Sequence, residues 1–248
     1  MSGIGENIVI LTAHQPVYLP WLGLFHKIAL ADHFISFDQV QFVPKDWISR
    51  NQILTPKGPI WLSVPCEKKG RFDSTISQTL IVNNSNWGRK HWNSIQFNYA
   101  KAKFFKKYAD FLEDTYQREW TLLADLNAHI LSWALDELGI KVPVESAGKF
   151  EFQGEKSALV LDMCQQLKAD AYIFGALGKD YADVEAFEKA GVKAMFQDYE
   201  HPQYPQMHDG FTPYLSILDL LFNCGPDSFD VLMSGNINHT DVLKHLAD

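Results

Sequence analysis

Short apolar runs and longer segments with helical spacing of apolar residues alternate along most of the chain. Near the start, residues 7–13 form an apolar run rich in β-branched side chains, which is typical of a buried parallel strand. A polar loop follows, and residues 21–30 then have apolar side chains three to four positions apart, while residues 33–37 are apolar again. This order of strand, loop, helix and strand predicts a βαβ unit.

The middle of the chain has a different pattern. Residues 39–53 mix strand-like alternation with proline and indicate no clear element, whereas residues 60–64 and 75–82 are predicted strands. Helical spacing then continues from residue 87 to residue 138, which predicts a helical lobe inserted into the α/β pattern. Its helices are expected at residues 87–99, 104–116 and 122–138.

The alternation of strands and helices returns in the last part of the chain. The expected strands are residues 142–144, 171–174 and 192–196, and the expected helices are residues 155–167, 183–190, 215–222 and 240–246. The whole pattern predicts one α/β domain over residues 1–248, with a mostly parallel, Rossmann-like sheet that has helices on both faces. Because such sheets bind ligands outside the carboxyl ends of their strands, the segments after the strands should converge on one cleft. Those segments are residues 14–16, 38–41, 175–181 and 198–206.

Composition and charge argue against several classes of function. The formal net charge is −8, whereas a nucleic-acid-binding protein usually has a basic face. The three cysteines are far apart and form no CxxC motif, so neither a zinc site nor a disulfide framework is predicted. There is no secretory signal pattern, and no apolar stretch approaches the roughly 20 residues that cross a bilayer. We therefore expect a cytoplasmic protein without a nucleic-acid or membrane partner.

Four side chains suited to ligand binding follow the first predicted strand closely. They are His14, Gln15, Tyr18 and Trp21. The start of the next helix offers free N–H groups that attract phosphate or carboxylate, and the histidine and glutamine add donors. We take His14 as a candidate catalytic residue and the other three as candidate ligand contacts. The alternative is that His14 and Gln15 only bond neighbouring loops.

Asp38 ends the second predicted strand, and Gln41 follows it closely. A carboxylate at this point can bind Mg²⁺, accept a proton or hold a sugar hydroxyl, although a turn aspartate is the alternative. We treat Asp38 as a second catalytic candidate and Gln41 as a ligand contact. Arg50 and Asn51 suit phosphate binding, but a surface arginine is the simpler explanation.

Two later loops add candidate ligand contacts. In the sequence GALGKDY, Gly175 permits close backbone approach to a ligand that Asp180 and Tyr181 can contact. His201 lies in a proline-rich loop that is predicted to form a rim or lid, because the spacing of its histidines does not support a metal site. No metal ligands are assigned. Walker A, GxSxG and HExxH motifs are absent from the sequence, as is a Gly-rich phosphate-binding fingerprint.

A set of long, ordered motifs resembles the WbqC-like family over about residues 9–226. They are HQPVYLPWLGLFHKIALADHFISFDQVQF, WISRNQI, WLSVP, GKDY, HPQYPQ and FTPYLSILDLLFNCG. The resemblance implies an association with surface-polysaccharide (O-antigen) biosynthesis and the transfer of glycine or another acyl group to an amino sugar. Asp38 is followed by Gln39, where many members are expected to have a second acidic residue, which weakens any mechanism based on paired carboxylates.

The first strand, the Gln-Pro loop and the first helix also look like the start of nucleotidylyltransferase-type α/β folds, in which this region holds ATP phosphates. One enzyme of that group, pantothenate synthetase, forms an amide through an acyl-adenylate. The two-histidine signature of the group is not intact, because only His14 and His26 are available. Fold similarity by itself does not establish a function.

The leading hypothesis is an N-acyl or aminoacyl transferase that acts on a nucleotide-linked amino sugar, with ATP and Mg²⁺. A non-catalytic sugar-nucleotide-binding partner and a nucleotidylyltransferase are the alternatives. The large number of tryptophan and tyrosine residues also allows a homodimer.

Overall fold

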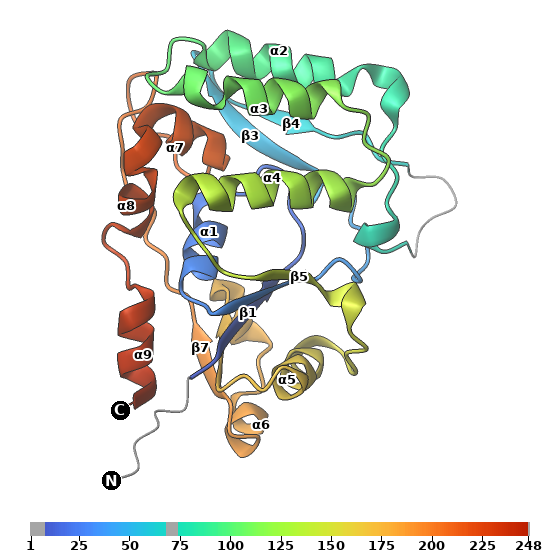
Figure 1. The fold of residues 1–248 in the computed structure, drawn as a ribbon, viewed down its shortest axis with the longest axis vertical. Helices are drawn as coiled ribbons and strands as arrows, with labels where there is room; N and C mark the ends of the chain where they lie inside the picture. Colours follow the sequence, from blue (N-terminus) through green and yellow to red (C-terminus); the bar gives the residue numbers. More distant parts are fainter. Residues whose placement is uncertain (1–7, 68–73, 248) are drawn as a thin grey trace.

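The computed structural model describes residues 8–67 and 74–247, and a five-stranded parallel sheet lies at its centre (Figure 1). The strands are β1 (Ile10–His14), β2 (His33–Ser36), β5 (Val144–Ser146), β6 (Ala171–Phe174) and β7 (Lys193–Phe196). Their order across the sheet is β5-β2-β1-β6-β7, and every neighbouring pair is parallel. The predicted Rossmann-like α/β fold is confirmed. Asn7, which was assigned to the first strand, lies outside the described residues.

Strand β1 shows why its sequence is apolar at consecutive positions. Leu11 and Ala13 belong to a cluster with Val160 of helix α5, whereas Ile10 packs in a different cluster with Val242 of helix α9. Successive strand side chains point to opposite faces, so a strand that is covered on both faces needs an unbroken apolar run. Helices therefore cover both faces, as predicted. Their bounds are α1 (Leu22–Ala29), α5 (Lys156–Gln166), α6 (Val184–Lys189) and α9 (His239–Ala247).

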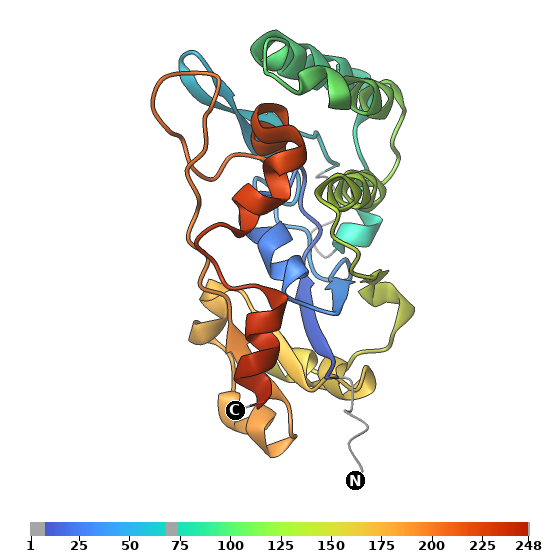
Figure 2. The same cartoon turned by 60° about the vertical axis from the view of Figure 1, so that its left-hand side comes forward.

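A long insertion separates β2 from its outer neighbour β5. It contains the antiparallel hairpin β3 (Arg50–Thr55) and β4 (Gly58–Ser63), followed by α2 (Trp87–Tyr99), α3 (Phe105–Gln117) and α4 (Leu123–Leu138). Both ribbon views place α2 and α3 at one end of the molecule and α5 and α6 at the other (Figures 1 and 2). The three helices of the predicted lobe are confirmed. Gly139 ends α4 at a φ of 71°, which is a common glycine-dependent helix end.

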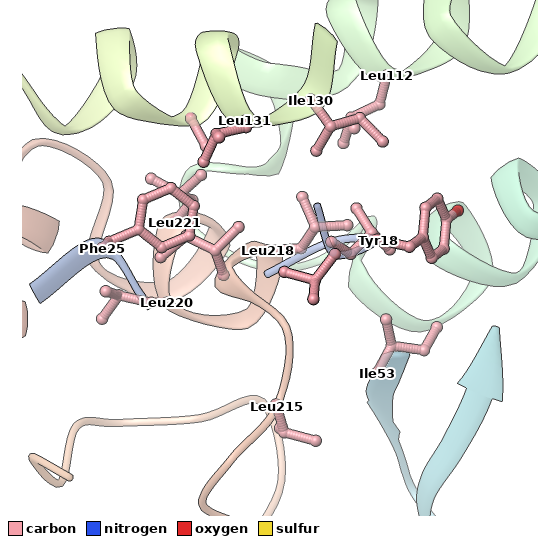
Figure 3. Close-up of a cluster of buried hydrophobic side chains, with 14 of the residues drawn as sticks. Tyr18, Phe25, Ile53, Leu112, Ile130, Leu131, Leu215, Leu218, Leu220 and Leu221 are labelled. Carbon is pink, nitrogen blue, oxygen red and sulfur yellow. The ribbon is translucent and has the colours of Figure 1, made fainter. Parts of the chain in front are cut away.

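The insertion and the sheet region share a large hydrophobic cluster (Figure 3). Ile53 of β3 and Leu131 of α4 belong to the same cluster as Phe25 of α1 and Leu218 of α7 (Ile217–Cys224). Burial of these side chains, at about 25 cal/mol per Å² of apolar surface, stabilises the insertion against the helices that flank the sheet. The loop after β1 is therefore enclosed between the insertion and the sheet region.

One prediction of secondary structure was wrong, and one helix was not predicted. The segment 75–82 was expected to be a strand, but it contains the short turn η1 (Ile76–Gln78) and makes only isolated bridges, including Cys66 with Ile81. Successive residues pair with different neighbours there, so no continuous ladder forms. Helix α8 (Ser228–Met233) was not predicted. None of the helices in residues 8–67 and 74–247 is long and apolar enough to cross a membrane.

Candidate functional site

The order of the strands creates a topological switch point between β1 and β6. Connections leave these adjacent strands toward opposite edges of the sheet, so a crevice opens between the loops at their carboxyl ends. A cleft of about 620 Å³ lies there, which we call the main cleft. Its lining includes His14, Gln15, Trp21, Lys27, Gly175, Tyr181, Gln197, Asp198 and Tyr199.

His14 ends strand β1 and is uncharged at neutral pH. Its Nδ1 lies 2.8 Å from the backbone oxygen of Gln15, and because that oxygen can only accept, Nδ1 carries the proton. Burial, followed by the charge of Lys27, lowers the pKa of His14 to about 4, although the bond to Gln15 opposes this shift. Nε2 therefore retains its lone pair and can accept a proton from a ligand in the main cleft.

Lys27 is a buried cation in helix α1. Its Nζ donates to the backbone oxygen of Ala13 at 2.9 Å, and burial lowers its pKa to about 8. None of the ion pairs found among the described residues includes Lys27. A buried charge without an opposite charge is costly, so this site favours an anionic ligand. Sequence reasoning missed Lys27, although a lysine beside His26 in a short, mostly apolar helix was a usable signal.

Trp21 and Tyr199 line the main cleft, and Tyr214 packs near Trp21 without lining it. The ring of Trp21 lies 5.7 Å from those of Tyr199 and Tyr214, measured between centroids. A Cβ at position 23 would come within 2.1 Å of the Trp21 ring, so Gly23 permits this ring to lie against α1. His201, a predicted ligand contact, lines neither the main cleft nor the α4 pocket, and its ring centroid lies 5.3 Å from that of Tyr214. Such faces suit a nucleobase or a sugar ring.

Gln197 presents an oriented acceptor to the main cleft and was also missed. Its Nε2 donates to the backbone oxygen of Gly23 at 2.8 Å and to Nδ1 of His26 at 2.9 Å. Nε2 of His26 must donate to the backbone oxygen of Ile237, so its Nδ1 must accept. The amide of Gln197 is thereby fixed, and its Oε1 makes no hydrogen bond within the described parts of the chain.

Asp38 does not lie in the main cleft. It lines a smaller cavity of about 300 Å³ between the ends of β2 and β5 and helix α4, which we call the α4 pocket. Gln15 lines both the cleft and this pocket. The prediction that four segments converge on one cleft was therefore wrong for Asp38, because β2 and β6 lie on opposite sides of β1.

Two predicted ligand contacts are buried inside the protein instead. Tyr18 is fully buried in the hydrophobic cluster (Figure 3). Its hydroxyl lies 2.8 Å from Nδ1 of His91 and 2.6 Å from the hydroxyl of Tyr116. Asn51 donates from Nδ2 to the backbone oxygen of Leu19 at 2.5 Å. Both residues connect the loop after β1 to the insertion, and neither lines the main cleft.

Three further predicted contacts lie outside the main cleft and the α4 pocket. The guanidinium of Arg50 lies 4.2 Å from the centroid of the Trp61 ring on the hairpin. Gln41 forms a bridge with Thr75, and Asp180 is exposed at the end of the turn after β6. The remaining candidates, Gly175 and Tyr181, line the main cleft, where Tyr181 is 47% exposed.

The side chains near the main cleft can be tested for whether they could hold the proposed magnesium ion. In residues 8–67 and 74–247, no group of three or more His, Cys, Asp or Glu side chains is placed to hold a metal ion. Mg²⁺ is commonly held by one or two carboxylates together with substrate phosphates. Asp198, which lines the main cleft, is the carboxylate there that can share a metal with a bound phosphate.

Comparisons with known proteins agree with the resemblance of the motifs. No solved structure matches the chain. A protein of Mycobacterium tuberculosis, named Uncharacterized protein Rv1507c, is 36% identical over 220 residues, which cover 88% of this chain and 95% of that protein. The model of the WbqC-like protein family matches residues 15–231, a range that begins in the loop after β1. This chain therefore belongs to the WbqC-like protein family.

Proposed function

We propose that the main cleft is the active site of a transferase that moves an acyl or aminoacyl group onto a nucleotide-linked amino sugar. Membership of the WbqC-like family suggests a role associated with polysaccharide biosynthesis. The observation that carries the proposal is the pair formed by uncharged His14 and buried Lys27 at the switch point. These two groups supply a proton acceptor and an anion-binding charge in one cleft.

The transfer step requires proton removal and charge stabilisation. The amino nitrogen of the acceptor attacks the carbonyl carbon of the donor, a C–N bond forms, and the leaving group departs with its electron pair. Nε2 of His14 accepts the proton that the nitrogen loses, a role that contributes about 10²- to 10⁴-fold to the rate. The ammonium of Lys27 stabilises negative charge on the leaving group or on the carbonyl oxygen.

ATP is the proposed source of activation, through an acyl-adenylate. In the activating reaction a carboxylate oxygen attacks the α-phosphorus and pyrophosphate leaves; AMP is the leaving group of the transfer step. The cleft fits such a ligand because Lys27 can hold phosphate and the rings of Trp21 and Tyr199 can hold adenine. Its volume of about 620 Å³ falls within the range of small-molecule sites, roughly 300–1,000 Å³. Mg²⁺ would be held by Asp198 together with the phosphates.

The test combines the protein with ATP, Mg²⁺, a set of amino acids and short carboxylic acids, and a UDP-linked amino sugar. We expect pyrophosphate release together with an amide product whose mass equals the sum of both substrates minus water. His14→Ala should slow amide formation about 10²- to 10⁴-fold while the far-ultraviolet circular dichroism spectrum stays unchanged. Amide formation by His14→Ala at the normal rate would remove His14 from the mechanism.

The same assay separates the two alternatives. Pyrophosphate release with a new nucleotide sugar and no amide would identify a nucleotidylyltransferase. Saturable binding of the UDP-sugar without turnover would identify a binding partner. Absence of both turnover and nucleotide binding would contradict the proposed role of the main cleft.

A further inference from the structure

We propose that the α4 pocket binds the primary ammonium group of the acceptor. This inference rests on the proposed function in one respect, namely that the main cleft holds the anionic donor. The pocket lies on the other side of β1, between the ends of β2 and β5 and helix α4. Its volume of about 300 Å³ is half that of the main cleft, which suits a single sugar ring or a small amino acid.

Asp38 is held in place with one oxygen poorly satisfied. Its Oδ2 accepts a hydrogen bond from Oγ of Ser146 at 2.6 Å, which fixes the carboxylate against β5. Among the described residues, its Oδ1 receives only a long contact of 3.4 Å from Nε2 of Gln39. A charge-assisted hydrogen bond is normally below 3 Å, so Oδ1 retains capacity to accept from a ligand.

Asn127 supplies a second, independent sign of a ligand. This residue of α4 lines the α4 pocket and is 1% exposed. Its Nδ2 donates to the backbone oxygen of Ile48 at 2.9 Å, and because that oxygen can only accept, the amide orientation is settled. Its Oδ1 is buried and has no hydrogen-bond partner in the described parts of the chain. Buried oxygens of this kind normally have a donor, so a donor from a ligand would complete the site.

The charges around the α4 pocket favour a cation. Asp38 and Asp125 contribute two carboxylates, and Lys149 is the positively charged residue in the lining. Lys149 is exposed at the rim, where its Nζ already contacts a carboxylate oxygen of Glu145 at 3.4 Å. Oδ1 of Asp38 and Oδ1 of Asn127 are acceptors, whereas Gln15 and Ser36 can donate or accept. A primary ammonium carries three donors and a positive charge, which suits the two carboxylates of this lining.

The two sites meet at the end of β1. Gln15 lines both of them, and the backbone nitrogen of Phe37 donates to the backbone oxygen of His14 at 2.8 Å, so the ends of β1 and β2 are joined directly. In the proposed reaction the ammonium held by Asp38 first gives one proton to solvent, and the neutral amine then attacks the donor beside His14, which accepts the second proton as the C–N bond forms. The arrangement brings a cationic acceptor and an anionic donor to opposite sides of one strand end.

The experiment measures binding of D-glucosamine, with D-glucose as the neutral probe, by isothermal titration calorimetry at pH 6.5. We expect saturable binding of glucosamine and none of glucose. Asp38→Asn keeps the shape and the acceptor for Ser146 but removes the charge, and should weaken glucosamine binding tenfold or more. Asp180→Asn is the matched control, because Asp180 is exposed and lies outside both sites, and it should change nothing.

A second variant separates this inference from the proposed function. Lys27→Met should weaken ATP binding and leave glucosamine binding unchanged. Asp38→Asn should weaken glucosamine binding and leave ATP binding unchanged. If ATP does not bind but glucosamine binding depends on Asp38, the proposed function fails and the ammonium site stands. Equal binding of glucose and glucosamine, equal binding by wild type and Asp38→Asn, or no saturable glucosamine binding in the millimolar range would each overturn the inference.

Discussion

The main cleft and the α4 pocket flank the same strand end, yet they have opposite electrostatic character. The cleft contains Lys27, a buried cation for which residues 8–67 and 74–247 supply no ion-pair partner, whereas the pocket contains Asp38, a half-buried carboxylate fixed by Ser146. The strand order explains the difference, because β1 separates the β6 side from the β2 side. The central strand of this doubly wound sheet therefore serves two sites of opposite charge, and Gln15 and Leu24 line both of them.

The largest expected effect is the loss of turnover in His14→Ala, about 10²- to 10⁴-fold if His14 is the proton acceptor. His91 is a matched control, because burial also lowers its pKa to about 4 but it lies in the core against Tyr18. His91→Gln should leave turnover nearly unchanged. Equal losses of turnover in both variants would show that the effect of His14→Ala is structural.

The same two histidines predict how stability depends on pH. Both have an ordinary pKa of 6.5 and a folded-state pKa of about 4, so the unfolded chain binds more protons between these values. The free energy of unfolding should therefore fall as the pH is lowered from 6.5 to 4. Urea titrations across this pH range should show that the free energy of unfolding falls less steeply in His14→Ala and in His91→Gln than in the wild type. An unchanged pH dependence would show that the histidine concerned is not held neutral.

Lys27→Met has the next largest expected effect, and it tests whether the main cleft depends on its positive charge. Loss of the cation should weaken ATP binding about 100-fold, since removing one partner of a buried charge pair costs about 2–5 kcal/mol. At pH 7 the variant should nevertheless be more stable by up to about 3 kcal/mol, because the pKa of Lys27 is lowered from 10.5 to about 8 and each pKa unit is worth about 1.4 kcal/mol. Loss of the bond to Ala13 offsets about 1 kcal/mol of this gain.

The sign of the Lys27 effect can be checked with pH. Between pH 8 and 10.5 the unfolded chain binds more protons than the folded one, so the stability of the wild type should rise over this interval. Lys27→Met should lack that rise. Urea unfolding at several pH values in this interval measures both proteins, and parallel curves would contradict a buried, charged Lys27.

Gln15→Ala tests whether the two sites share a residue in function. One hydrogen bond contributes about 0.5–1.5 kcal/mol, so the variant should weaken ATP and glucosamine binding by up to about tenfold each. Calorimetry with the two ligands separately measures this. A loss confined to one ligand would mean that Gln15 serves one site alone.

Tyr18→Phe has the smallest expected effect on ligands. Removal of the hydroxyl breaks its contacts with His91 and Tyr116, which should lower the free energy of unfolding by about 1–3 kcal/mol because a buried partner is left unsatisfied. Binding of ATP and glucosamine should not change. Thermal unfolding and calorimetry test the two statements, and weaker ligand binding would show that this cluster is coupled to the main cleft.

Local patterns were sufficient to predict most elements of the fold. The apolar run of β1 and the long helical spacing of α2, α3 and α4 reflect burial that is already visible within one segment. The strand predicted at residues 75–82 is absent because the backbone segments beside it, and not its own periodicity, decide whether a continuous β-ladder forms. Tyr18 was assigned to a cleft because an amphipathic ring suits both a cleft and a core, and only the packing of α2 and α3 decides between them.

Strand order and burial limited what could be predicted about the site. The carboxyl-end rule placed His14 and Gly175 near a cleft, and both line the main cleft, but the linear sequence does not show that Asp38 leaves the sheet on the opposite side of β1. Lys27 was overlooked because a helical lysine is usually solvated, and its burial depends on the sheet packed against α1. The position of Asp38 and the burial of Lys27 both depend on contacts between segments that are distant in sequence.

The insertion between β2 and β5 affects how the chain folds while it is being synthesised. Strand β1 emerges early from the ribosome and pairs with β2, but β5 follows only after residues 37–143, and β6 comes later still. A nascent chain that has not reached β6 leaves one edge of the central strand open, and open edges recruit strands from other chains. The loop closures needed before β5 can pair also slow assembly of the sheet. The helices of the insertion, whose contacts are more local, can form while the sheet is still incomplete.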